Sequence, residues 1–138
     1  MAIDFKMERK GDYLLVTCQG PYTGKGLIAV CQHAIDHAGE EGLRAILMDT
    51  TGLSGYSPTA MERFGYAEAV AELQRSRGGN IWIAFVGKEP MVDPGRFGET
   101  VAVNRGAALK VFEDSGEAAD WIRECLATQA GAEDGDGA

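Results

Sequence analysis

Hydroxyl and carboxylate side chains gather in one stretch of the chain, from Asp49 to Glu62. The stretch follows a short apolar run at 45–48 and leads into a predicted helix. Unpaired backbone N–H groups and the helix dipole would stabilise a phosphoryl group at such a helix start. Asp49 itself stands at the carboxyl end of a predicted strand, where α/β sheets place functional groups. The alternative interpretation, for the stretch and for Asp49, is an ordinary loop that these side chains cap.

Two further groups of residues have a spacing that suggests a site. His33 and His37 are four residues apart and share a helix face, as two metal ligands would. That face lies opposite the apolar side of the same helix and the sequence offers no third ligand, so we expect both imidazoles in water. The segment from Gly20 to Gly26 lies between a strand and a helix, but its glycine spacing differs from that of a phosphate-binding P-loop. We interpret it as a glycine-rich helix entry.

The sequence contains no pattern typical of catalysis. It lacks the Gly-x-Ser-x-Gly turn of serine hydrolases and holds only four serines. The two histidines are not part of a His-Glu-x-x-His motif. We therefore expect no catalytic residue, no metal and no cofactor, and predict that the chain is not an enzyme.

Length, charge and cysteine content narrow the class of protein. A chain of 138 residues fits one domain, and 13 basic against 21 acidic side chains give a net charge of −8, which disfavours nucleic acid as a partner. No apolar run reaches the roughly 20 residues of a membrane span, and the first residues lack a signal-peptide pattern. Cys18, Cys31 and Cys125 show no Cys-x-x-Cys spacing and fall in apolar phases, which favours free thiols in a reducing cytoplasm.

We predict a domain over residues 1–128 and a disordered acidic tail over 129–138, because the tail holds only Ala, Gly, Gln, Glu and Asp. Within the domain, hydrophobic periodicity predicts the order ββαβαβαβα: a mostly parallel α/β sheet with an N-terminal antiparallel hairpin and helices packed on it. We expect strand 81–86 at the centre of the sheet, and Pro58 as the first residue of the second helix with Ser57 as its N-cap. The predicted strands are 3–7, 13–18, 45–48, 81–86 and 108–112; the predicted helices are 22–38, 58–76, one from Asp93–Pro94 to Gly106, and one after a capping box at Asp114–Glu117.

Several of these segments together resemble the STAS domain, which is found in sulphate transporters and anti-sigma-factor antagonists. The resemblance spans residues 2–127. It rests on the opening hairpin, the strand that ends at Asp49 with Gly-Leu-Ser at 52–54, the strand at 81–86, and the run Val111–Ile122. That last run resembles the family's closing strand, acidic cap and Ala-x-x-Trp helix. The chain looks closest to the bacterial STAS-like proteins that are grouped with Sec14 and CRAL-TRIO lipid binders.

The resemblance implies a regulatory protein with a protein partner, such as an anti-sigma factor, a kinase-like protein or another regulator. In STAS proteins that antagonise anti-sigma factors, the partner phosphorylates a serine in Asp-[Ser/Thr]-[Ser/Thr]-Gly at the start of the second helix. Asp49–Gly52 has these letters, but it follows the strand directly. Counting from the strand end places the modified hydroxyl at Ser57 or Thr59 instead.

We therefore predict partner binding through residues 49–59 and the exposed side of helix 58–76. The side chains expected to make contact are Asp49, Tyr56, Met61 and Tyr66.

The alternative function is binding of a lipid or another apolar molecule, because Sec14-like relatives hold lipids in apolar pockets. Phe64, Trp82 and Phe97 would line such a pocket here, unless these rings simply fill the core. A homodimer through an edge strand or an exposed helix is also open.

Overall fold

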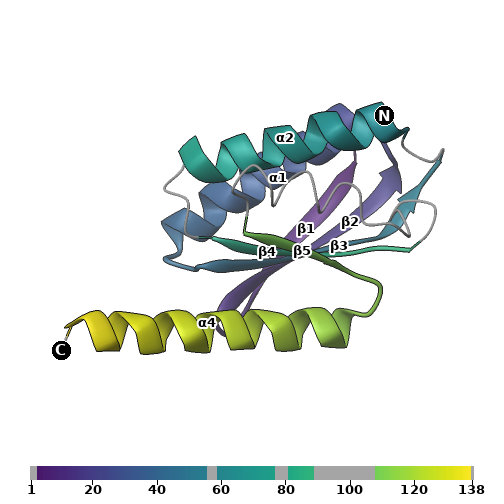
Figure 1. Cartoon of the computed structure of the whole chain (residues 1–138). Helices are drawn as coiled ribbons and strands as arrows, with labels where there is room; N and C mark the ends of the chain where they lie inside the picture. The colour runs from purple at the N-terminus through teal and green to yellow at the C-terminus, as the bar shows by residue number, and fades with distance from the viewer. Residues whose placement is uncertain (1–2, 56–58, 77–80, 89–107, 138) are drawn as a thin grey trace.

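The computed structural model of the chain describes residues 3–55, 59–76, 81–88 and 108–137. Of residues 60, 63, 64, 66 and 129–137 it describes the backbone alone. Figure 1 draws the remaining residues as a thin grey trace. The helix predicted after Asp93–Pro94 lies outside the described residues.

The chain begins with the predicted antiparallel hairpin. Strands β1 (Asp4–Lys10) and β2 (Tyr13–Pro21) pair from Asp4 opposite Gln19 to Lys10 opposite Tyr13. The two-residue turn between them contains Gly11 at φ +68°, a backbone conformation that glycine adopts without steric cost.

Strand β2 is longer than predicted, because Gly20–Pro21 does not break it. Its last residues pair in parallel with the end of strand β3 (Ala45–Ser54), where Pro21 lies opposite Ser54. Proline has no N–H group to donate, but the next residue does: the Tyr22 N–H donates to the Ser54 carbonyl at 2.7 Å. Hydrogen bonding between the two strands therefore continues past the proline.

The described sheet has five strands in the order β1-β2-β3-β4-β5, with β4 at Trp82–Val86 and β5 at Leu109–Phe112. All pairs after the hairpin are parallel. The expected central strand was wrong: β3 lies in the middle, and β4 lies between β3 and β5. The reason is that β2 and β3 are neighbours, which shifts every later strand one place towards the far edge. Strand β4 is nevertheless well covered, since four of its five residues are buried.

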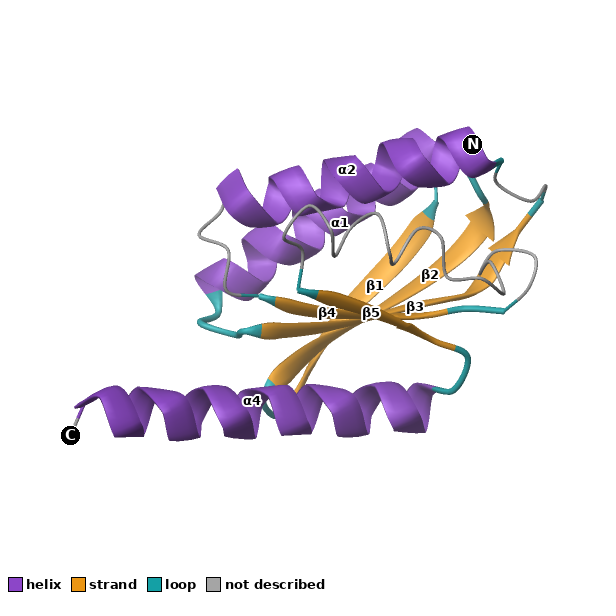
Figure 2. Cartoon of the chain, in the orientation of Figure 1, coloured by secondary structure: helices purple, strands orange, loops and turns teal. Residues whose placement is uncertain are grey.

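Helices cover the two faces of the sheet unequally (Figure 2). Helices α1 (Gly24–Glu40) and α2 (Ala60–Ser76) lie side by side on one face, called here the α1–α2 face. The single helix α4 (Ser115–Gly137) lies on the other, the α4 face, and packs mainly against β3, β4 and β5. Alternate strand residues supply a core to each helix layer, as period-2 side-chain alternation requires. Val16, Met48 and Ile83 belong to the first core, and Leu47 and Ala84 to the second.

Local hydrogen bonds account for the helix starts. The Thr23 hydroxyl accepts from the Gly26 N–H at 2.9 Å and begins α1. The Asp114 carboxylate accepts from the Glu117 N–H at 2.9 Å and begins α4, which confirms the predicted cap. Helix α4 continues through 129–137, the segment for which the sequence predicts a disordered tail. Those residues contain no proline that would end the helix.

No helix in the described part of the chain is both long and apolar enough to cross a membrane.

Candidate functional site

Half of the predicted loop 49–59 is strand. Strand β3 continues through Asp49 to Ser54, and residues 52–54 pair with the end of β2. Between the pairs Thr17–Asp49 and Gln19–Gly52, β2 has one residue and β3 has two, so β3 carries a bulge at Thr50 and Thr51. The hydroxyl-bearing residues Thr50, Thr51 and Ser54, which the sequence predicts in a loop, are therefore part of the sheet.

Asp49 organises the end of β3. Its Oδ1 accepts hydrogen bonds from the Thr51 N–H at 2.9 Å and from the Thr51 hydroxyl at 2.7 Å. Asp49 is half-buried, and in the ladder it lies opposite Thr17 on one side and Val86 on the other. The carboxylate therefore has a structural use already, which supports the interpretation of Asp49 as a cap.

Thr50 has a different use from its neighbours. It is buried, and its hydroxyl donates to the Val86 carbonyl at 2.8 Å. This hydrogen bond extends the contact between β3 and β4 past the last paired residues. Of the four letters Asp49–Gly52, only Thr51 then presents an exposed hydroxyl, and that hydroxyl donates to Asp49.

The start of α2 differs from the prediction: the helix begins at Ala60, and the cap is Thr59. The Thr59 hydroxyl accepts from the Glu62 N–H at 3.2 Å, while Glu62 Oε1 accepts from the Thr59 N–H at 3.2 Å. This is a reciprocal capping box, which satisfies two backbone donors at once. The sequence Thr-Ala-Met-Glu at 59–62 has the spacing of a capping box and could have predicted this helix start. The prediction instead used Pro58, which favoured Ser57 as the N-cap.

Met61 lies inside this first turn and is 80% exposed. Within the described residues, the only other large hydrophobic side chain in the exposed class is Phe5, at 37%. An isolated exposed apolar side chain is common on protein surfaces. Met61 is notable because it stands one residue from Glu62 and two from Thr59, which form the capping box.

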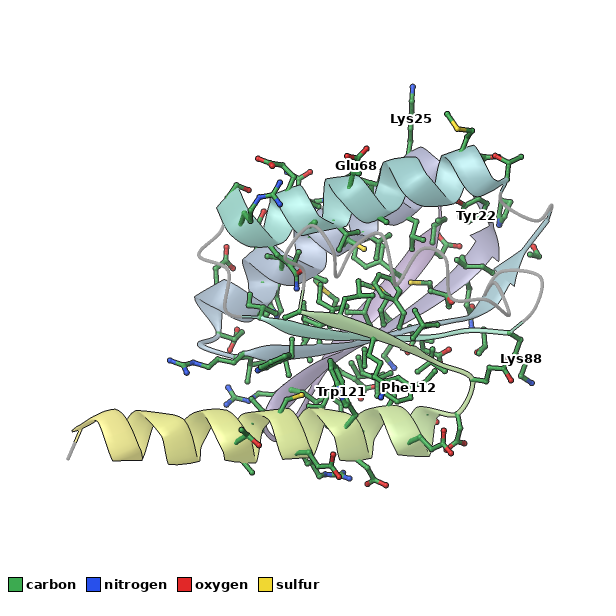
Figure 3. The ribbon with its side chains drawn as sticks, in the orientation of Figure 1. Tyr22, Lys25, Glu68, Lys88, Phe112 and Trp121 are labelled. Atoms are coloured by element: carbon green, nitrogen blue, oxygen red, sulfur yellow. The ribbon has the colours of Figure 1, made fainter. Side chains whose placement is uncertain are left out.

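Of the three residues of the expected apolar pocket, only Trp82 has a described side chain. Trp82 lies on the α4 face, where its ring meets Trp121 edge-on with centroids 5.8 Å apart. Trp121 in turn contacts Phe112 at 5.8 Å (Figure 3). Phe64 belongs to α2, on the opposite face of the sheet, so Trp82 and the α2 backbone are separated by the sheet itself. Trp82 is partly buried and packs against the second core.

For several other predicted site residues, the structure describes either nothing or the backbone alone. Tyr56, Ser57 and Phe97 fall outside the described residues. Tyr66, like Phe64, is placed only as a backbone position on α2.

The two histidines lie at the surface of α1. His33 is exposed and stacks on Phe5 of β1, with ring centroids 5.8 Å apart; His37 is half-buried. Over the described ranges, no three His, Cys, Asp or Glu residues are grouped so that they could hold a metal ion.

The cysteines are free, as predicted, and two of them are buried. The Cys18 thiol lies 3.7 Å from the Met48 sulfur, to which it donates. Burial, and secondarily the negative charge of Asp49, raises the pKa of Cys18 to about 11. Burial, and secondarily Cys18, raises the pKa of Cys31 to about 12. Both groups are thus inert thiols at neutral pH, unlike the low-pKa cysteines used as nucleophiles.

Comparison with solved structures follows this geometry. An anti-sigma factor antagonist from Mycobacterium paratuberculosis matches with a TM-score of 0.59 and 13% sequence identity, over 88% of this chain and 95% of that chain. This chain has a STAS-like fold. An uncharacterized protein from Shewanella loihica PV-4, described as having a SpoIIAA-like fold, matches with a TM-score of 0.49 and 21% identity, over 87% of this chain and 93% of that one. No protein-family model and no curated protein matches the sequence.

The resemblance read from the sequence is thereby confirmed at the level of the fold. In this STAS-like domain the capping box and Met61 stand at the start of α2. A surface hollow lies elsewhere: it is open, has a volume of about 340 Å³, and is lined by residues of the hairpin, namely Asp4, Phe5, Lys6, Glu8, Thr17 and Gln19.

Proposed function

We propose that this STAS-like chain is a non-enzymatic regulatory domain of the cytoplasm that binds a protein partner at the start of α2. The binding surface consists of Thr59, Met61 and Glu62 and is called here the α2 start surface. The observation that carries the proposal is the 80% exposure of Met61 beside the capping box. The fold is that of a protein named an anti-sigma factor antagonist, which supports a protein regulator as the partner. The free thiols support a reducing compartment.

The physical basis is the gain from covering Met61. Burying a methionine side chain fully against a partner is worth about 1.5–3 kcal/mol. Methionine is flexible and polarisable, so it adapts to an apolar pocket of varied shape. A contact of this size at the centre of an interface is typical of a hot spot. Asp49, Tyr56 and Tyr66 are proposed as surrounding contacts.

Phosphorylation of Thr59 is the proposed control. A phosphoryl group adds a charge of about −1.5 to −2 near neutral pH, beside an apolar contact and next to the Glu62 carboxylate. The helix dipole favours an anion at this end of α2, so the modified helix start stays folded while a further negative charge is placed beside the apolar contact at Met61. Ser57 is the alternative acceptor hydroxyl.

The test is site-specific photocrosslinking in cells that express the chain. A benzophenone amino acid replaces Met61 in one variant and Ala127 in the other, and mass spectrometry identifies crosslinked proteins. Ala127 is an exposed position on α4, across the sheet from α2, and so is a matched helical control. We expect a defined protein to be captured at position 61 and not at 127. Capture of nothing at 61, or of the same proteins at both positions, would contradict the proposal.

Affinity measurements with the captured partner then test the residues. We expect Met61→Asp to weaken binding about tenfold or more, whereas Ala127→Asp leaves it unchanged. Thr59→Glu should weaken binding and Thr59→Ser should not. If Thr59→Glu binds like the wild type while Ser57→Glu does not, the control hydroxyl is Ser57.

A further inference from the structure

Strand β1 is the open edge of the sheet. It pairs with β2 on one side, and in the described part of the chain no strand pairs with its other side. Only alternate residues of an antiparallel strand exchange hydrogen bonds with a given neighbour. Counted from the two-residue turn after Lys10, the residues whose N–H and C=O groups point to the open side are Phe5, Met7 and Arg9. Such an edge is a template for another strand unless its side chains prevent pairing.

The charges of β1 are arranged so that a second copy fits. Along one face of the strand, Asp4, Lys6, Glu8 and Lys10 alternate in sign. When two copies run antiparallel with Met7 opposite Met7, position 4 faces position 10 and position 6 faces position 8. Every facing charge on this side then has the opposite sign. Opposite charges on facing strand positions are stabilising, and like charges are destabilising.

We propose that two copies of the chain form a homodimer through their β1 edges in this register. Two pairs join Asp4 to Lys10 of the partner subunit, and two join Lys6 to Glu8 of the partner subunit. On the α1–α2 face, Phe5 lies opposite Arg9 of the partner subunit, where a cation can contact an aromatic ring. The proposal is independent of the α2 start surface and stands whether or not that surface binds a partner.

Neighbouring registers are excluded by the same charges. A shift of the central position from Met7 to Lys6 places lysine opposite lysine and Asp4 opposite Glu8. A shift to Glu8 places glutamate opposite glutamate and Lys6 opposite Lys10. Charged edges usually keep strands apart, but here they select one register among three.

The isolated chain leaves two of these charges without a partner. Within the described residues, neither the Asp4 carboxylate nor the Lys6 amino group makes a hydrogen bond or an ion pair, and both are exposed. The other charged side chains of β1 already form exposed ion pairs. Lys10 Nζ lies 3.3 Å from Glu8 Oε2, and Arg9 Nη1 lies 3.8 Å from Glu41 Oε2. Dimerisation therefore gives partners to the two side chains that lack them.

Net charge does not oppose this pairing at the edge itself. The whole chain carries −8, but β1 holds three basic residues (Lys6, Arg9, Lys10) and two acidic ones (Asp4, Glu8), a net of +1. The acidic excess lies on other parts of the surface, and its repulsion is screened beyond about 8 Å at physiological ionic strength.

Sedimentation velocity across a concentration series tests the dimer directly. We expect the wild type to approach twice the 14.7 kDa chain mass as concentration rises. Lys6→Glu replaces two attractive pairs with two repulsive ones and should raise the dissociation constant at least about tenfold. The double variant Lys6→Glu/Glu8→Lys restores opposite signs at the facing positions and should recover dimerisation.

Lys25→Glu is the matched control, because Lys25 is an exposed α1 residue that points away from the body of the molecule (Figure 3). It makes the same change in net charge and should leave the dimer intact. Circular dichroism verifies that every variant folds. A wild type that stays monomeric throughout, a double variant no better than Lys6→Glu, or equal weakening by Lys25→Glu would each overturn the proposal.

Discussion

Gly52 of β3 lies against the β2 backbone. A Cβ atom placed there would lie 2.5 Å from the Cys18 carbonyl oxygen and 3.0 Å from the Gln19 side chain. Gly52 comes directly after the bulge at Thr50 and Thr51 of β3, where the pairing between the two strands is irregular. The glycine of the Asp-Thr-Thr-Gly motif is therefore required by backbone packing. Recognition by a kinase is not needed to explain it.

Gly52→Ala should lower the free energy of unfolding by about 1–3 kcal/mol, because the methyl group collides with backbone that has little room to move. Gly65→Ala is the control: Gly65 is an exposed residue of α2 with no atom near its potential Cβ. It should stabilise the chain by about 0.5–1 kcal/mol, since alanine favours helix. Urea denaturation measures both. Equal effects of the two substitutions would show that the contact at Gly52 is relaxed in solution.

At the scale of elements, Gln74 fastens the end of α2 to the starts of two strands. It is 3% exposed, and its side-chain N–H₂ group donates to the Ile81 carbonyl at 2.7 Å and to the Ala108 carbonyl at 3.3 Å. Ile81 precedes β4 and Ala108 precedes β5. One buried amide thus aligns a helix with two strands that are far apart in the sequence.

Gln74→Leu should cost about 1–3 kcal/mol of unfolding free energy, because it leaves a buried carbonyl short of a donor. Gln32→Leu makes the same change at an exposed position of α1 and should have little effect. Thermal and urea denaturation of the two variants provide the comparison. If Gln74→Leu were as stable as the wild type, a water molecule or a backbone shift would have to satisfy the Ile81 carbonyl.

Periodicity in the sequence was enough to predict these elements but not their ends. The apolar spacing of α1 and the β4 run marks buried faces directly, so both segments were predicted within a few residues. The end of β3 depends on its pairing with Gly20 and Pro21, which lie more than thirty residues away, so no local pattern could place it at Ser54. The same error affected the predicted binding loop at 49–59, because residues 49–54 of that loop belong to β3.

The cap of α2 was a different kind of error. The sequence has two patterns that are typical of a helix start: Ser57 followed by Pro58, and the capping box Thr59–Glu62. In the structure the second one begins the helix. The orientation of Trp82 could not be predicted for a third reason. Whether Trp82 points to α2 or to α4 depends on strand parity within the assembled sheet, which aromatic content alone does not specify.

For the molecule as a whole, two buried cysteines lie in the core of the α1–α2 face. Cys18 and Cys31 are essentially inaccessible, and the neutral thiol is the form that the core accommodates. Their raised pKa values make the stability of the whole fold dependent on pH in the alkaline range.

The sign of that dependence follows from proton binding. Between the ordinary thiol pKa near 9 and the folded values of about 11 and 12, the unfolded chain releases protons that the folded chain retains. The contribution of these thiols to stability is therefore complete below about pH 9 and is lost as pH rises towards 11–12. Each thiol adds up to about 1.4 kcal/mol of loss per pH unit.

Urea denaturation from about pH 8 to 11 measures this slope. We expect Cys31→Ala to be less stable than the wild type near neutral pH, because it leaves a small cavity, but to lose stability less steeply above pH 9. Cys125→Ala should change the slope less, since that thiol is only partly covered. Identical slopes for the wild type and Cys31→Ala would mean that Cys31 does not titrate as the burial implies.

The strand order β1-β2-β3-β4-β5 is also the order in which a ribosome makes the strands. Each strand leaving the exit tunnel finds its neighbour already synthesised, and α1 is available to cover the first three. The layer on the α4 face is different, because α4 is translated after all five of the described strands, and the aromatic rings of Trp82 and Phe112 stay uncovered until then. A nascent chain stalled before Ser115 would thus carry a nearly complete sheet with one exposed apolar face. Chaperones bind intermediates that expose such surface.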